Sequence, residues 1–112
     1  SSAASDVYKR QINYQHNAVI RRGIEMVSQK VKIKNPTGLH LRPAGILCKE
    51  AMQYKSLVTF HYRGNTANAK SVLSVLGACI KFGDEIEFVC EGDDEDEALK
   101  AMVEAVESGL GE

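Results

Sequence analysis

The sequence has few cysteines, two prolines and no long apolar run. Its three cysteines, Cys48, Cys79 and Cys90, are widely spaced and each lies in an apolar segment, which favours reduced core thiols over a disulfide framework or a metal site. No apolar run approaches the roughly 18 residues that a membrane span needs. No signal-peptide pattern precedes Met26, and the glycines form neither a GxGxxG nor a Walker loop. We therefore expect a cytoplasmic chain without membrane insertion, metal, cofactor or nucleotide fold.

One domain is expected from 112 residues, and its start is predicted to lie inside the sequence. The first eleven residues read like the in-frame translation of a transposon adapter, and the next fourteen have no hydrophobic periodicity. A pair of arginines shortly before Met26 fits a translated ribosome-binding sequence. We expect residues 1–25 to be a non-native leader and residues 26–112 to form the domain.

Hydrophobic periodicity divides the domain into strands and helices. Alternating or β-branched runs predict four strands, at residues 29–34, 57–62, 66–69 and 85–91. One-sided apolar stripes predict three helices, at residues 43–54, 71–77 and 92–108. The order βαββαβα fits an α+β open-faced β-sandwich, a four-stranded antiparallel sheet with three helices on one face.

The first predicted helix begins at a cluster of polar groups. Pro43 lacks an amide hydrogen and fits the first helical turn, which puts His40 at or beside the N-cap and Arg42 just inside. First-turn amides, the helix dipole and a permanent guanidinium charge suit a phosphate-sized anion. An unperturbed imidazole is mostly neutral at pH 7 and therefore nucleophilic. The cluster is predicted to bind a phosphate or to carry one on His40; the alternative is a turn histidine that only caps a helix.

Charge is distributed unevenly along the chain. Residues 26–83 hold nine Lys/Arg against Glu50 alone, and the remaining 29 residues hold twelve acids against Lys100. The prediction is a basic half, which contains His40 and Arg42, and an acidic half. A partner with an acidic docking face would be steered to the basic half. Nucleic acid is a weaker alternative, because clustered Lys/Arg with interleaved aromatics is absent from the sequence.

Short motifs connect the domain to a known family. They are Gly-Leu-His at 38–40, Arg-Pro-Ala at 42–44, Asn-Ala-Lys-Ser at 68–71 and Gly-Leu-Gly-Glu at 109–112. Across residues 26–112 the sequence resembles HPr, the histidine-containing phosphocarrier family of the bacterial sugar phosphotransferase system. The resemblance implies that His40 accepts a phosphoryl group from phospho-enzyme I and passes it to a sugar-specific enzyme IIA domain, with Arg42 stabilising the phosphate. It implies a monomeric carrier rather than an enzyme.

A second site is predicted at Ser71. From the residues alone Ser71 is an N-cap worth about 1 kcal/mol. The resemblance to HPr of Gram-positive bacteria implies phosphorylation by an HPr kinase/phosphorylase and a corepressor role with the catabolite control protein. A phosphate there would weaken enzyme I binding by repulsion and desolvation. The rival interpretation is a regulatory interaction protein that acts only through phosphorylated Ser71.

The resemblance also implies a docking surface for the partner proteins, made of Gly45, Val72, Leu73 and Leu76. The default expectation for leucines in a helix is a place in the core, although a two-turn helix cannot bury every face. Two further features are given ordinary interpretations. His61 is expected to be a surface residue of a strand, and the acidic run 93–97 is expected to be a solvated helix start, because it lacks the spacing of a calcium loop.

Overall fold

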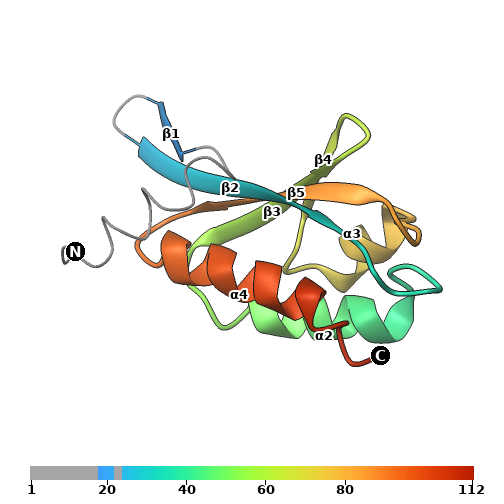
Figure 1. The fold of residues 1–112 in the computed structure, drawn as a ribbon. Helices are drawn as coiled ribbons and strands as arrows, with labels where there is room; N and C mark the ends of the chain where they lie inside the picture. The colour runs from blue at the N-terminus through green and yellow to red at the C-terminus, as the bar shows by residue number, and fades with distance from the viewer. Residues whose placement is uncertain (1–17, 22–23) are drawn as a thin grey trace.

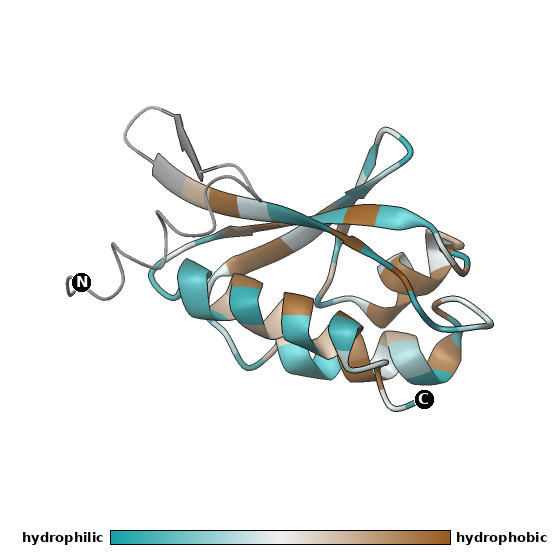
Figure 2. Ribbon diagram, in the orientation of Figure 1, coloured by the Kyte–Doolittle hydropathy of each residue, from teal (hydrophilic) through white to brown (hydrophobic). Residues whose placement is uncertain are grey.

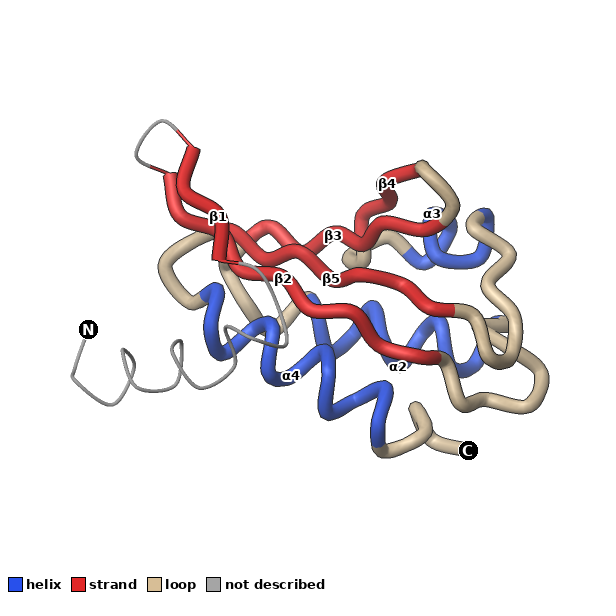
Figure 3. The backbone as a smooth tube through the Cα atoms, turned by 45° about the horizontal axis from the view of Figure 1, so that its top comes forward, coloured by secondary structure: helices blue, strands red, loops and turns tan. Residues whose placement is uncertain are grey.

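The structure is a computed structural model that describes residues 18–21 and 24–112. Its elements are β1 Ala18–Arg21, β2 Ile24–Lys32, α2 Leu41–Ala51, β3 Leu57–Tyr62, β4 Asn65–Asn68, α3 Val72–Gly77, β5 Glu85–Glu91 and α4 Glu95–Glu107. The strands form one sheet in the order β1-β2-β5-β3-β4, with every neighbouring pair antiparallel. The helices cover one face of the sheet, and α2 and α4 run side by side in opposite directions (Figures 1 and 3).

The core lies between the sheet and the helices. In β5 the side chains of Ile86, Phe88 and Cys90 are buried and alternate with glutamates and Val89, as the period of two predicts. Phe88 meets Phe60 of β3 edge to face, with ring centroids 6.3 Å apart. Leu47 of α2 is fully buried from the helix side. Hydrophobic segments of the helices turn toward the sheet and polar segments turn away (Figure 2).

The predicted α+β sandwich is confirmed, with the four predicted strands and the three predicted helices in the expected order. The sheet has in addition a fifth strand, β1, which pairs with β2 in the register Ala18↔Val27 to Arg21↔Ile24. This strand falls inside the predicted leader. Main-chain pairing at a sheet edge needs no hydrophobic period, so a pattern search does not reveal such a strand. For the same reason β2 begins at Ile24, five residues before its alternating part.

Two expectations about burial, the core thiols and the solvated acidic run 93–97, are each wrong at one residue. Cys90 is buried and Cys48 half-buried, but Cys79 is exposed, because it follows the six-residue α3 and leaves the core with a φ of 56°. Burial raises the pKa of the Cys90 thiol to about 12, with the Glu95 charge acting in the same direction. Glu95 itself is 5% exposed and is not part of a solvated helix start. Its Oε1 accepts a hydrogen bond from the backbone of Gly92 at 3.1 Å, which holds the acid inward.

In the described residues, none of the helices is both long and apolar enough to cross a membrane. Of the predicted leader, residues 1–25, the stretches 1–17 and 22–23 lie outside the described residues, and His16 is among them. That residues 1–25 are non-native stays a prediction.

Candidate functional site

The segment before His40 is fixed by the turn that precedes β5. Leu39 donates its backbone N–H to Ile80 O at 3.0 Å, and Gly83 donates to Ile33 O at 2.9 Å. Gly38 has a φ of 75°, and a Cβ at this position would lie 2.4 Å from Ile80 O. Only glycine fits such a close approach in this conformation. Gly38, the glycine of the Gly-Leu-His motif, therefore allows the loop before His40 to pack closely against the backbone of Ile80.

His40 is the N-cap of α2, as predicted, and its ring is open to solvent. Its backbone is extended, with φ −79° and ψ −166°, and its side chain makes no capping hydrogen bond. The side chain is 45% exposed. Ala44 donates the first intrahelical bond to His40 O at 2.9 Å, so the amides of Leu41 and Arg42 lie ahead of it without intrahelical acceptors. The arrangement presents an imidazole, two amides and a guanidinium at one helix end.

Arg42 carries its charge next to this helix start. The side chain is exposed, and the described residues contain no ion pair to it. Its Nε lies 3.9 Å from the place where a Cβ on Gly111 would stand, so the end of the chain passes directly beside it. An exposed guanidinium with no ion pair to the described residues is available to an incoming phosphate.

A carboxylate from the other end of the sequence contacts the histidine. Glu112 Oε2 lies 2.8 Å from His40 Nε2, and Glu112 Oε1 accepts a hydrogen bond from Asn35 Nδ2 at 2.9 Å. The Asn35 side chain also donates to Gly109 O at 2.9 Å, and the residue is 1% exposed. The bond from Asn35 lowers the pKa of the Glu112 carboxyl; partial desolvation opposes it, and His40 and Arg42 act in the same direction as Asn35.

Asn35 and Glu112 were missed by the sequence reasoning. Because α2 and α4 are antiparallel, the chain leaving α4 arrives where α2 begins (Figure 1). It turns back through Gly109, Leu110 and Gly111, all with positive φ, at 93°, 50° and 84°. The two glycines of the Gly-Leu-Gly-Glu motif were the available signal for this turn.

The prediction of separate basic and acidic halves is wrong. Glu112, from the acidic segment, touches His40, and Lys34 forms an ion pair with Glu107 of α4. In the sheet, Lys30 stands opposite Glu87. The reason is topological, because β5 lies between β2 and β3 and so inserts acidic residues among basic ones.

Ser71 is the N-cap of α3, as predicted. Its Oγ accepts a hydrogen bond from the backbone N–H of Ser74 at 3.2 Å, and the residue is only half-buried. The neighbouring Lys70 donates from Nζ to Tyr54 O at 2.6 Å. The Ser71 hydroxyl is thus engaged in capping.

The residues of the predicted docking surface differ in exposure. Leu73 is 78% exposed, whereas Val72 and Leu76 are half-buried against the core. Gly45 lies on α2, which packs against α3, and a Cβ at Gly45 would meet no atom within 4 Å. Leu41, which follows the histidine, is 68% exposed. The fold therefore places apolar atoms in solvent on the two helices next to His40.

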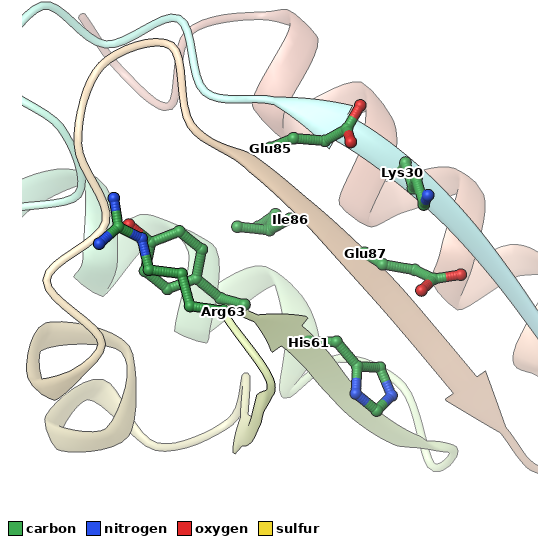
Figure 4. Close-up of a pocket in the computed structure, with 7 residues that line it drawn as sticks. Lys30, His61, Arg63, Glu85, Ile86 and Glu87 are labelled. Atoms are coloured by element: carbon green, nitrogen blue, oxygen red, sulfur yellow. The ribbon is translucent and has the colours of Figure 1, made fainter.

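A hollow on the outer face of the sheet is separate from this site (Figure 4). His61 is exposed there, as expected, and its Nδ1 lies 2.9 Å from Thr66 Oγ1. Among the described residues no group of three His, Cys, Asp or Glu side chains is placed to hold a metal ion. The lining carries charges of both signs, which gives the hollow no preference for an anion; it consists of Lys30, His61, Tyr62, Arg63, Glu85, Ile86 and Glu87.

Comparison with known proteins gives concordant matches over the domain. Residues 27–108 match the family described as the PTS HPr component phosphorylation site. The chain is 35% identical over 82 residues to the HPr-like protein Crh of Bacillus subtilis (strain 168), covering 73% of this chain and 96% of that protein. It is 34% identical over 88 residues to the phosphocarrier protein HPr of Lysinibacillus sphaericus, covering 78% and 100%. The crystal structure of HPr-C-His from Thermoanaerobacter tengcongensis matches with a TM-score of 0.73 and 36% identity, covering 76% of this chain and 96% of that one.

Proposed function

The chain belongs to the HPr family of phosphocarriers of the phosphotransferase system, and on this premise we propose that His40 accepts a phosphoryl group from phospho-enzyme I and donates it to a sugar-specific enzyme IIA domain. The observation that carries the proposal is the exposed His40 ring at the uncapped start of α2. A carrier must be reached by two different proteins in turn, and an exposed ring at the end of a helix is accessible to both.

The nucleophile is Nδ1 of His40. Nε2 is engaged by Glu112 at 2.8 Å, and the described residues provide no hydrogen bond to Nδ1. In the transfer, the Nδ1 lone pair forms a bond to phosphorus while the bond from phosphorus to the donor atom of enzyme I breaks, and that electron pair stays with the donor. The second transfer reverses these roles with enzyme IIA as acceptor. No cofactor is required for either step.

Arg42 and the first-turn amides neutralise the phosphate. Phosphoryl transfer through a loose transition state depends mainly on positioning and on charge stabilisation. The guanidinium supplies a full charge, and the amides of Leu41 and Arg42 supply the positive end of the α2 dipole. Their proximity to His40 supports this role.

Partner proteins dock on the surface formed by Gly45, Val72, Leu73 and Leu76. The exposed Leu73 and the open space above Gly45 support this assignment, because an apolar side chain of a partner can occupy it without displacing atoms of this fold. We propose that the protein is a cytoplasmic monomer. Related proteins, an HPr of Thermoanaerobacter tengcongensis and Crh of Bacillus subtilis, are described as dimers. Light scattering across a concentration series tests the proposed state.

Substitution of the histidine tests the carrier function. His40→Ala is expected to abolish phosphoryl uptake from phosphoenolpyruvate and enzyme I while leaving the fold intact, since the side chain is exposed. His61→Ala is the matched control, because His61 is also exposed but lies on the outer sheet face. Uptake by the His40→Ala protein at the wild-type rate would refute the proposal.

A second function, regulation through phosphorylated Ser71, is supported by the similarity to Crh, which is described as a catabolite repression protein. The partners are then an HPr kinase/phosphorylase and the catabolite control protein. A phosphate on Ser71 would stand at the N-terminus of α3, next to exposed Leu73, and would impose charge and desolvation on docking at that surface. In the rival form of this function, His40 takes no part.

Mass spectrometry after incubation with such a kinase and ATP tests the regulatory function. We expect one added phosphate on Ser71, none in a Ser71→Ala variant, and slower phosphoryl uptake by His40 in the modified protein. An unmodified Ser71 would contradict this function and leave the carrier function standing.

A further inference from the structure

We propose that Glu112 and Asn35 act as a positioning pair that keeps the proton of the His40 ring on Nε2 and so leaves the Nδ1 lone pair free for phosphorus. The inference rests on the proposed phosphoryl transfer by His40. It extends the site to two side chains that lie outside the Gly-Leu-His and Arg-Pro-Ala motifs.

The first step is the direction of the contact between Glu112 and the ring. Glu112 Oε2 lies 2.8 Å from His40 Nε2. An ionised carboxylate only accepts hydrogen bonds, so the nitrogen that faces it must carry the hydrogen. A neutral imidazole has one N–H. The lone pair is therefore on Nδ1, the atom that the proposed transfer uses.

The second step is what holds the carboxylate in place. Asn35 is almost fully buried, and its Nδ2 faces two acceptors, Glu112 Oε1 and Gly109 O, each at 2.9 Å. Two acceptors around one atom identify it as the NH2 group, whose two hydrogens are then both in use. Its Oδ1 is buried without a hydrogen-bond partner among the described residues, which is a cost to the fold. The arrangement ties the carboxylate to the turn at Gly109.

The third step is the effect on transfer in both directions. When Nδ1 bonds to phosphorus while Nε2 keeps its hydrogen, the ring becomes a phosphorylated imidazolium. The Glu112 carboxylate stabilises that positive charge. When the phosphoryl group departs to an acceptor, the N–P bonding pair returns to Nδ1 and the ring leaves as neutral imidazole, with its proton already on Nε2. The pair thus lowers the barrier for uptake, and it spares the donation step a separate transfer of the ring proton.

The test replaces Glu112, whose carboxylate only accepts hydrogen bonds, with glutamine, whose side chain has one accepting and one donating end. In Glu112→Gln the amide oxygen is expected to face Asn35 Nδ2, which only donates. The amide NH2 group then faces His40 Nε2 and requires a lone pair there. Glu107→Gln is the matched control, because Glu107 is paired with Lys34 and makes no contact with the histidine. Ring ¹⁵N shifts of the labelled protein report which nitrogen carries the hydrogen, and enzyme I kinetics are measured with each protein as substrate.

We expect the hydrogen to move from Nε2 to Nδ1 in Glu112→Gln. We also expect kcat to fall about tenfold at unchanged KM. This loss is smaller than the one caused by replacing the buried aspartate of a Ser-His-Asp triad, because Glu112 and His40 are partly exposed. Glu107→Gln should match the wild type in both measurements. A Glu112→Gln protein that keeps the hydrogen on Nε2, or that transfers at the wild-type rate, would overturn the proposal. The tautomer is read before any phosphoryl transfer, so this failure is distinct from failure of the carrier function, which the His40→Ala experiment decides.

Discussion

The two helices that carry the predicted phosphorylation sites begin in different ways. At α3, Ser71 closes the helix start with its own hydroxyl, which accepts from Ser74, the third residue of the helix. At α2, His40 makes no such bond, and the third residue is Pro43, which has no N–H to offer. The start of α2 therefore resists capping by a side chain, and its amides stay available to a transient anion.

The start of α4 shows a third solution. Asp94 occupies the N-cap position but does not cap its own helix. Its carboxylate instead accepts backbone N–H groups of Lys55 and Ser56, each at 2.9 Å, and also the Ser56 hydroxyl. Acids in the first turn complement the α4 dipole. Among the described helices, α2, where we propose that phosphate binds reversibly, begins with neither a side-chain cap nor first-turn acids.

The largest expected effect follows from giving α2 the N-cap of α3. His40→Ser should abolish phosphoryl uptake completely, because the nucleophile is gone. The His40→Ser protein should be only about 0.5 kcal/mol more stable than His40→Ala, because the serine hydroxyl can accept a hydrogen bond from the Arg42 amide but not from Pro43. Uptake is followed with labelled phosphoenolpyruvate, and stability with urea denaturation. If His40→Ser is more stable than His40→Ala by about 1 kcal/mol, the amount expected for the Ser71 cap, then Pro43 does not limit capping of α2.

Reversing the charge at the open helix start should have the next largest effect. Arg42→Glu is expected to slow phosphoryl transfer about 100-fold, in the range seen when a group that stabilises transition-state charge is removed. Arg42→Lys should lie between that variant and the wild type, because Lys keeps the charge but lacks the fork of donors. Stopped-flow transfer rates with phospho-enzyme I measure both. Equal rates for the two variants would exclude a charge role.

The contact of Asp94 with the loop before β3 should be visible in the pH dependence of stability. Burial opposes ionisation, yet the bonds from Ser56 and from the backbone at Lys55 outweigh it and lower the pKa of the Asp94 carboxyl. The contribution of the Asp94 carboxylate to the free energy of unfolding is therefore fully present above the ordinary aspartate pKa, about 3.9. It is lost as the pH falls through the lower pKa that Asp94 has in the folded protein.

Urea denaturation between pH 7 and pH 2 measures this contribution. Asp94→Ala should cost about 2 kcal/mol at pH 7 and flatten the acid limb of the stability curve. Asp93→Asn, at the exposed neighbouring residue, is the control and should change neither. An unchanged acid limb in Asp94→Ala would show that other groups dominate the acid response.

The smallest effect is expected at the capped helix. Ser71→Ala removes the acceptor for the Ser74 amide and should cost about 1 kcal/mol. Ser71→Asp should restore most of that loss, because aspartate is an equally good N-cap and its charge complements the dipole. Thermal denaturation compares the three proteins. If the alanine protein is as stable as the wild type, water caps α3 equally well.

Short sequence patterns predicted the strands and helix caps that depend on residues close together in the sequence. The alternation of Ile86, Phe88 and Cys90 gave the central strand, and Ser71 was recognised as an N-cap, because both depend on neighbours within a few residues. His40 and Arg42 were found because the proline after them marks a helix start. The contact with Glu112 spans 72 positions and depends on how α2 and α4 pack, which no periodicity encodes.

The end of α3 has a practical consequence for the study of self-association. Cys79 is exposed and holds a left-handed backbone conformation that a side chain seldom adopts. An accessible thiol reacts with a second thiol in air, so two copies can become joined by a disulfide that owes nothing to complementary surfaces. Association that persists in excess reductant, or in a Cys79→Gly protein relieved of both thiol and strain, is the association that the fold itself encodes.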